Sequence, residues 1–208
     1  MNLEKKRKLA LLFMAFVPLI FICVYYDAEI IRFFYQFKTP LLTEIFSFIG
    51  KFSSKVVIFS LLTCLFLWEN KKRRWILPVW FSLALSVAIS FILKISIQRL
   101  RPFQQGLVYL SPSLASPDFS TWNFSFPSFQ TMLVFSAIPI ICKNFPKLKY
   151  LWIILSCLIG LSRVYFGLHF LSDVLSGALI GLFIGELIVI SEQKNKFWQR
   201  TYEKLFKK

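Results

Sequence analysis

The feature that most constrains this chain is a set of six apolar stretches separated by polar segments. A helix needs about 20 apolar residues to cross the hydrocarbon core of a bilayer. Some stretches are shorter, but they adjoin polar segments that can extend the same helices. The pattern predicts an all-α, polytopic membrane bundle of about six transmembrane helices, forming one domain over residues 1–208. The stretches are 9–26, 52–68, 75–93, roughly 129–142, 150–161 and 174–191.

The basic character of the chain fits a membrane protein better than a nucleic-acid-binding protein. The formal net charge is +15, and 57% of the residues are hydrophobic. The Lys and Arg residues form short clusters between apolar stretches, which is the topology signal of membrane proteins. They do not form a basic stripe interleaved with exposed aromatics. Nucleic acid is therefore not an expected partner.

The same clusters predict the orientation in the membrane. Basic segments lie at 4–8, 69–74 and 143–149 and in the tail from Gln193. Positive charge concentrates on the cytoplasmic side, and all four segments fall on one side if six spans alternate. The first stretch is longer than the core of a signal peptide and no A-x-A-like site follows it, so we interpret it as a retained span. The expectation is a plasma- or inner-membrane protein with both termini in the cytoplasm.

The opposite side then holds residues 27–55, residues 103–126 and the turn near Gly167. Residues 27–55 are amphipathic in patches, which predicts interfacial helices on the outer leaflet. Residues 103–126 are rich in proline and serine, which predicts an outer loop containing Asp118. Glycines recur every four residues in the last stretch, and this spacing favours close helix packing, either within the bundle or between subunits of a homo-oligomer. They are Gly177, Gly181 and Gly185.

Ionisable residues at the outer ends of the spans mark a candidate site, because charged groups at membrane depth are costly. Lys94 and Arg101 follow the third stretch, and a spacing of seven residues puts both on one helical face, roughly 10 Å apart along the axis. Two residues that extend to lipid headgroups would give the same pattern.

A second group contains the only histidine of the chain, His169. Asp173 follows four residues later, so on a helix its carboxylate can accept a hydrogen bond from the ring. That contact would fix one ring nitrogen as N–H and leave the other as a nucleophile. Arg163 lies just upstream, and its planar fork suits phosphate oxygens. The group therefore favours a catalytic role over a structural one.

A third segment begins the fourth stretch, at Pro127 and Ser128. The N-terminus of a helix offers unpaired N–H groups and a positive dipole end, which suit an anion. The hydroxyl of Ser128 adds a donor, although a serine at this position is often only a cap.

These segments resemble the signature motifs of the type-2 phosphatidic acid phosphatase family, whose superfamily includes the vanadium haloperoxidases. The first motif, K-x6-R-P, matches Lys94, Arg101 and Pro102, and the third, S-R-x5-H-x3-D, matches residues 162–173. The resemblance implies that His169 attacks phosphorus and forms a phosphohistidine, with Asp173 orienting it.

The resemblance also implies a phosphate site made by Lys94, Arg101 and Arg163, with no metal and no cofactor. The second motif of the family is P-S-G-H, in which the serine and the glycine amide bind phosphate and the histidine protonates the leaving group. Here Phe129 and Gln130 replace the glycine and the histidine. The Phe129 amide can still bind phosphate, but Gln130 cannot deliver a proton.

Three explanations of Gln130 stay open. A diphosphate substrate has a leaving group that needs little protonation, which favours a polyprenyl diphosphate. Another group, such as a loop residue or water, could supply the proton. The third explanation is a disabled site that only binds phosphorylated lipid.

The leading prediction is hydrolysis of a lipid diphosphate of polyprenyl type, or of a lipid monophosphate, at the outer leaflet. The alternative is a catalytically impaired family member that binds phosphorylated lipid. A transporter or flippase also places charges inside spans, but the motif matches argue against it.

Overall fold

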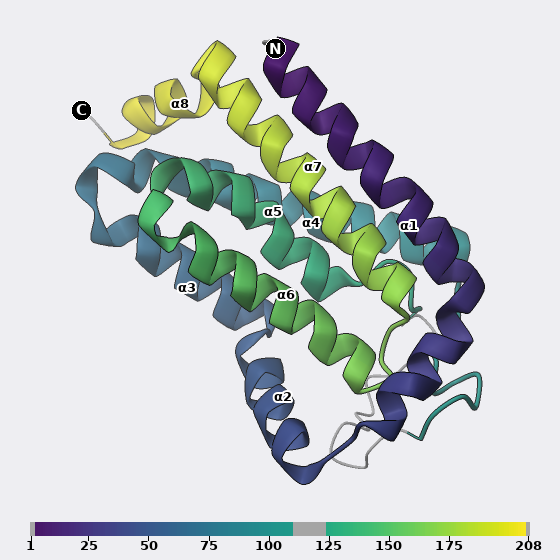
Figure 1. The fold of residues 1–208 in the computed structure, drawn as a ribbon. Coiled ribbons are helices and arrows are strands. Elements are labelled where there is room, and N and C mark those ends of the chain that lie inside the picture. Colours follow the sequence, from purple (N-terminus) through teal and green to yellow (C-terminus); the bar gives the residue numbers. More distant parts are fainter. Residues whose placement is uncertain (1–2, 110–123, 207–208) are drawn as a thin grey trace.

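The computed structural model describes residues 3–109 and 124–206, and within these ranges the secondary structure is helical, without a strand. The prediction of an all-α polytopic bundle is confirmed (Figure 1). In chain order the elements are α1 (Leu3–Gln36), α2 (Pro40–Phe52), α3 (Lys55–Trp68), η1 (Asn70–Trp75), α4 (Ile76–Ile97), α5 (Phe129–Asn144), η3 (Pro146–Leu148), α6 (Lys149–Tyr165), α7 (Leu171–Asn195) and α8 (Phe197–Phe206).

The six predicted apolar stretches correspond to α1 and to α3 through α7. Four segments of the described chain are long and apolar enough to cross a bilayer: 13–36, 70–97, 146–165 and 171–195. A fifth span results if α2 and α3, which are bent by 64° at the break between them, are counted together. The remaining helix, α5, has only 16 residues. The predicted number of about six is therefore an approximation.

The short helix α5 is the centre of the bundle. It contacts α3, α4, α6 and α7, and most of its side chains are buried. The packing against α7 is close because α7 presents glycines there. A Cβ added to Gly177 would lie 2.6 Å from the carbonyl oxygen of Ser128, and one added to Gly181 would lie 2.5 Å from that of Met132. Gly185 meets Ser136 in the same way. The glycine repeat thus serves packing within the bundle.

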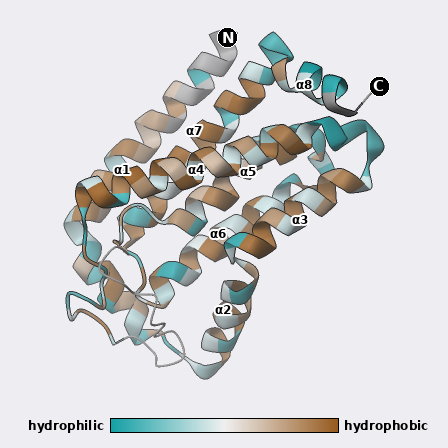
Figure 2. Ribbon diagram, turned by 180° about the vertical axis from the view of Figure 1, so that it is seen from behind, coloured by the Kyte–Doolittle hydropathy of each residue, from teal (hydrophilic) through white to brown (hydrophobic). Residues whose placement is uncertain are grey.

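The two ends of the bundle differ in character. The N-terminus, η1, η3 and α8 lie toward one end, whereas α2 and the connections that follow α4 and α6 lie toward the other (Figure 1). Hydrophobic residues cover the helices, and hydrophilic ones gather at η1 and α8 (Figure 2). Arg74 of η1 donates a hydrogen bond of 2.6 Å to Gln199 of α8. The predicted basic segments therefore lie toward the same end of the bundle (Figure 1), where the segment at 69–74 contacts the tail.

The segment predicted to form interfacial helices differs in part from the expectation. Residues 27–36 continue α1, which runs without a break for 34 residues. A separate helix begins only at Pro40, where Pro at the first position and the Thr39 side chain, which accepts from Leu42 N at 3.2 Å, start α2. Of the predicted outer loop, residues 110–123, including Asp118, lie outside the described ranges.

Candidate active site

A cavity of about 290 Å³ is lined by residues of α4, α5 and α6 and of the connections that follow α4 and α6. Its wall brings together most of the residues predicted for the site, from segments far apart in the sequence. Three of them carry positive charge and none of the described lining residues is acidic, so the cavity suits an anion. The lining residues are Lys94, Arg101, Phe129, Gln130, Arg163, Leu168 and His169.

The first segment reaches the cavity by a different route from the one predicted. The helix α4 ends at Ile97, and Gln98 adopts the left-handed conformation with φ of 50°, its N–H donating to the Lys94 carbonyl at 2.9 Å. Lys94 and Arg101 therefore do not share a helical face, because Arg101 lies beyond the end of the helix. The turn at Gln98 nevertheless brings Arg101 to the same cavity. The Lys94 ammonium, which lines the cavity, donates to the Phe124 carbonyl.

The second segment begins α5 as predicted, with Ser128 as the N-cap residue. Ser128 is fully buried, its hydroxyl hydrogen-bonds that of Thr131 at 2.9 Å, and its N–H donates to the Asp173 carbonyl at 3.0 Å. The structure thus places Ser128 behind the cavity wall. Phe129 and Gln130 line the cavity from the first turn of α5, whose N–H groups have no acceptor within the helix.

The third segment is a reversal between α6 and α7. Gly167, with φ of 70°, allows the turn that brings Leu168 N and His169 N to the Arg163 carbonyl, at 3.0 and 3.3 Å. The helix α7 begins at Leu171, so His169 precedes it. His169 and Asp173 therefore do not lie on successive turns of one helix, as predicted, although their side chains still face each other. Nδ1 of His169 lies 3.8 Å from Oδ2 of Asp173, which is longer than a hydrogen bond.

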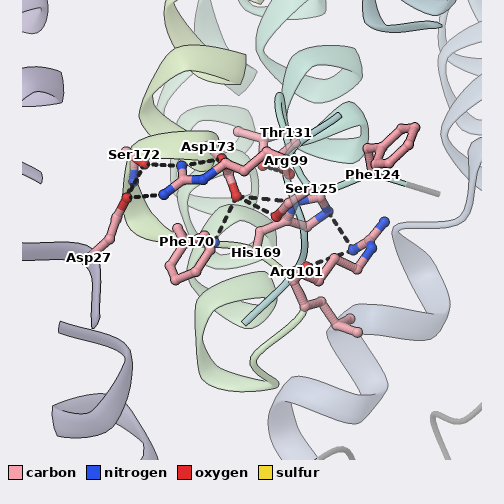
Figure 3. Close-up of polar contacts among 12 residues, drawn as sticks. Asp27, Arg99, Arg101, Phe124, Ser125, Thr131, His169, Phe170, Ser172 and Asp173 are labelled. Atoms are coloured by element: carbon pink, nitrogen blue, oxygen red, sulfur yellow. Dashed lines mark hydrogen bonds and ion pairs between the residues drawn. The ribbon is translucent and has the colours of Figure 1, made fainter. Parts of the chain in front are cut away.

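The imidazole of His169 is held in one tautomer by its neighbours (Figure 3). Nη1 of Arg101 lies 3.1 Å from Nε2. A guanidinium only donates hydrogen bonds, so Nε2 is the acceptor and the ring proton is on Nδ1. On that side, Ser125 Oγ lies 3.5 Å from Nδ1 and donates to Asp173 Oδ2 at 2.5 Å.

Burial decides the charge of these groups. Burial, reinforced by the positive charge of Arg101 and opposed by Asp173, lowers the pKa of His169 to about 3. The ring is therefore neutral at physiological pH and keeps a lone pair on Nε2. Burial likewise lowers the pKa of Arg101 to about 10, which leaves its guanidinium charged at neutral pH.

The guanidinium of Arg163 is only partly engaged by the protein. It donates through Nη2 to the hydroxyl of Ser53, at the break between α2 and α3. Its buried Nε has no hydrogen-bond partner within the described residues. An unsatisfied buried donor is costly, and an anion in the cavity would offer it an acceptor.

Three residues of this region were missed by sequence reasoning: Asp27, Arg99 and Ser125. The guanidinium of Arg99 bridges two carboxylates, with Nη2 2.6 Å from Asp27 and Nη1 2.7 Å from Asp173 (Figure 3). Asp27 could have been found, because it is a carboxylate that directly follows the first apolar stretch, at the end of a predicted span. Arg99 and Ser125 carry no such signal.

A bundle of membrane-length helices with a cationic cavity and a neutral imidazole in its wall defines a membrane protein built to hold an anion. A family model described as the PAP2 superfamily matches residues 75–197, more than half of the 208 residues. The chain belongs to the PAP2 superfamily, as the motifs indicated.

Individual relatives and a solved structure agree with this membership. The chain is 35% identical over 116 residues to phosphatidylglycerophosphatase B of Bacillus subtilis, a match that covers 50% of this chain and 52% of the relative, so the chain spans about half the length of that protein. It is 24% identical to an undecaprenyl-diphosphatase of Sulfolobus acidocaldarius, over 79% of this chain and 77% of the relative. The crystal structure of a PAP2-type phosphatidylglycerolphosphate phosphatase from Bacillus subtilis superimposes with a TM-score of 0.70 at 23% identity, covering 91% of this chain and 98% of that one, and shares the fold.

Proposed function

We propose that this protein is a lipid phosphatase that removes a phosphate group from a membrane lipid through a phosphohistidine on His169. The observation that carries the proposal is the composition of the cavity wall. Lys94, Arg101 and Arg163 face one space together with an unprotonated ring nitrogen. Phosphoryl transfer needs mainly charge neutralisation and an in-line nucleophile, and this wall supplies both.

The chemistry follows from these groups. A phosphate in the cavity attracts the Arg101 guanidinium, which releases the Nε2 lone pair of His169. Nε2 then bonds to phosphorus while the bond from phosphorus to the leaving oxygen breaks. Water attacks the phosphohistidine, releasing inorganic phosphate and restoring the neutral ring. The three cations bind the phosphate oxygens throughout.

An apolar groove next to the cavity supports a lipid substrate. It has a volume of about 370 Å³ and lies between α3, α4 and α5. Phe129 lines both the groove and the cavity, so the two spaces share a wall. A phosphate in the cavity would thus leave its hydrocarbon chain beside Phe129 and the groove. Other groove residues are Ile58, Phe59, Trp80, Leu83, Val87 and Leu133.

The place of Gln130 favours a diphosphate lipid of the polyprenyl type. Gln130 lines the cavity at the position of the acid histidine in the family motif, and it cannot donate a proton. A positioned acid is worth about 10²–10⁴ in rate where the leaving group is a poor one. The leaving group of a lipid diphosphate is a phosphate monoester, which needs little protonation. One relative is named an undecaprenyl-diphosphatase.

The reaction would take place at the outer leaflet. The basic segments gather at the end of the bundle that holds both termini, and such segments favour the cytoplasm (Figure 1). The cavity residues come from the opposite ends of α4, α5 and α6 and from the connections that follow α4 and α6. The proposed orientation has cytoplasmic termini and an extracytoplasmic cavity.

The alternative is a protein that binds phosphorylated lipid without hydrolysing it. The same observation, Gln130 in the place of an acid, favours it. In that case the cations would hold the headgroup and His169 would be a hydrogen-bond acceptor only.

Phosphate release separates the two functions. Purified protein in detergent would receive a polyprenyl diphosphate and, separately, phosphatidic acid, alongside a His169→Ala variant. Release by the parent protein, faster from the diphosphate and lost in the variant, supports the enzyme. Binding of both lipids without release would establish the alternative.

A further inference from the structure

We propose that Asp27 and Arg99 are positioning residues that hold Asp173, and through it His169, in the reactive orientation. The inference rests on the proposed function for its kinetic readout. Neither residue lines the cavity, so neither would touch the substrate. Arg99 is hydrogen-bonded directly to the groups that surround Nδ1 of the histidine, and Asp27 is hydrogen-bonded to Arg99.

The two oxygens of Asp173 have separate partners. Oδ1 accepts from Nη1 of Arg99 at 2.7 Å. Oδ2 faces the other way, accepting from Ser125 Oγ at 2.5 Å and from Phe170 N at 2.9 Å, with Nδ1 of His169 at 3.8 Å. The grip of Arg99 on one oxygen therefore sets the direction in which the other faces the imidazole.

Arg99 also fixes the second neighbour of the imidazole. Its backbone carbonyl accepts from Ser125 N at 2.7 Å, and Ser125 Oγ is the group 3.5 Å from Nδ1. The guanidinium carbon lies over the ring of Phe170, 4.2 Å from its centroid. One residue thus contacts both groups on the Nδ1 side of His169.

Asp27 anchors this arrangement to the first helix. It is 4% exposed and accepts from Nη2 of Arg99 at 2.6 Å. The same carboxylate accepts from the N–H and the hydroxyl of Ser172, at 3.2 and 2.5 Å, at the beginning of α7 (Figure 3). An acidic group at a helix N-terminus is stabilising. Asp27 therefore joins α1, Arg99 and the first turn of α7. Its partner there, Ser172, lies three residues from His169 along the chain and one from Asp173.

Conservative variants test the idea, each with a matched control. Asp27→Asn removes the charge that holds Arg99, and Glu29→Gln makes the same change at an exposed position of α1. Arg99→Lys keeps the charge but loses the fork that reaches two carboxylates, and Arg32→Lys is its exposed control. Asp27→Glu, which retains a carboxylate, should restore activity in part.

We expect kcat for phosphate release to fall roughly tenfold to a hundredfold in Asp27→Asn and Arg99→Lys, with KM within about twofold of the parent, because misplacing a reacting group mainly affects the chemical step. The double variant should be no slower than the slower single one, since both act through Asp173. The control variants Glu29→Gln and Arg32→Lys should keep the kcat of the parent. An unchanged kcat in both test variants, or a loss confined to KM, would overturn the inference.

A second readout does not depend on activity. Because His169 is the only histidine, ¹⁵N-histidine labelling gives the resonances of a single imidazole. The parent should show one tautomer with the proton on Nδ1, whereas both test variants should show broadened or mixed resonances. Spectra are compared at a temperature at which the same fraction of each protein is folded, as judged from its melting curve. Spectra identical to the parent would refute the positioning role. A parent protein that releases no phosphate would end the proposed function, and these spectra would still decide this inference.

Discussion

Nη1 of Arg101 lies 3.1 Å from Nε2 of His169, so an arginine donates a hydrogen bond to the lone pair that would attack phosphorus. A guanidinium prefers a doubly charged phosphate to a neutral imidazole as acceptor. Entry of the phosphate would therefore draw Arg101 away from Nε2 and uncover the nucleophile. The reactive form of the site would arise only when an anion is present.

The first prediction concerns Gln130. Replacing it with histidine should restore a proton donor, and hydrolysis of phosphatidic acid should rise by about 10²-fold because an alkoxide leaving group needs protonation. Hydrolysis of a polyprenyl diphosphate should change by less. Initial rates of phosphate release from both lipids measure the difference. An equal effect on both substrates would argue against leaving-group selection by Gln130.

Phe129 provides the second prediction, because it separates the phosphate cavity from the apolar groove. Phe129→Ala should weaken the binding free energy of the lipid chain by about 1 kcal/mol, because an apolar contact is lost. The KM for a long-chain diphosphate should therefore rise roughly fivefold. The KM for a short, water-soluble diphosphate should stay unchanged. Phe91→Ala, at a residue of α4 that is 61% exposed, is the control. Equal changes for long and short substrates would remove the groove from the account.

Sequence reasoning predicted the elements of this fold better than their junctions. The six apolar stretches became helices because hydrophobic length determines where a helix can cross a membrane. The end of α4 was mispredicted, because Gln98 adopts a left-handed conformation that glycine or asparagine would have signalled. Residues 27–36 were mispredicted for the opposite reason: the chain continues through Asp27 as a helix because the carboxylate is paired.

The candidate site shows the same limit. The motif residues could be assigned to one cavity because their types and spacing are specific. The bridge from Asp27 to Asp173 through Arg99 could not be assigned, because only tertiary contacts form it. Asp27 is 72 positions from Arg99 in the sequence, and Asp173 is 74 positions from it. Ser128 is the opposite case, because it was predicted from a motif but does not line the cavity. Its hydroxyl is hydrogen-bonded to that of Thr131 instead.

The third prediction is a dependence of stability on pH. The pKa of His169 is lowered by burial from 6.5 to about 3. Between these values the unfolded chain takes up a proton that the folded one does not. As pH falls below 6.5, this group therefore costs stability, by about 1.4 kcal/mol for each pH unit.

His169→Gln removes this contribution. Thermal unfolding in detergent from pH 7 to pH 4 should show the parent losing stability faster than the variant, while carboxylates elsewhere affect both equally. Curves that stay parallel would mean that the folded ring takes up its proton as readily as the unfolded one.

The fourth prediction concerns the contact of α7 with α5. Gly177→Ala should destabilise the protein by about 1–3 kcal/mol, since the new Cβ would press on the Ser128 carbonyl and force the helices apart. Gly50→Ala is the matched control, because the nearest atom to its Cβ would be Arg163 Nη2 at an ordinary 3.6 Å. Melting temperatures of the two variants in the same detergent provide the measurement. Comparable values for both would show that α7 is not fixed by this glycine.

The most direct measurement is a search for the phosphorylated intermediate. Protein mixed briefly with a polyprenyl diphosphate carrying a labelled terminal phosphate would be denatured in alkali, and the label on the protein counted and located. The account predicts an acid-labile, alkali-stable phosphoryl group on the only histidine, His169, and none in His169→Ala. Rapid phosphate release with no label on His169 at any time, or with the variant as active as the parent, would contradict it.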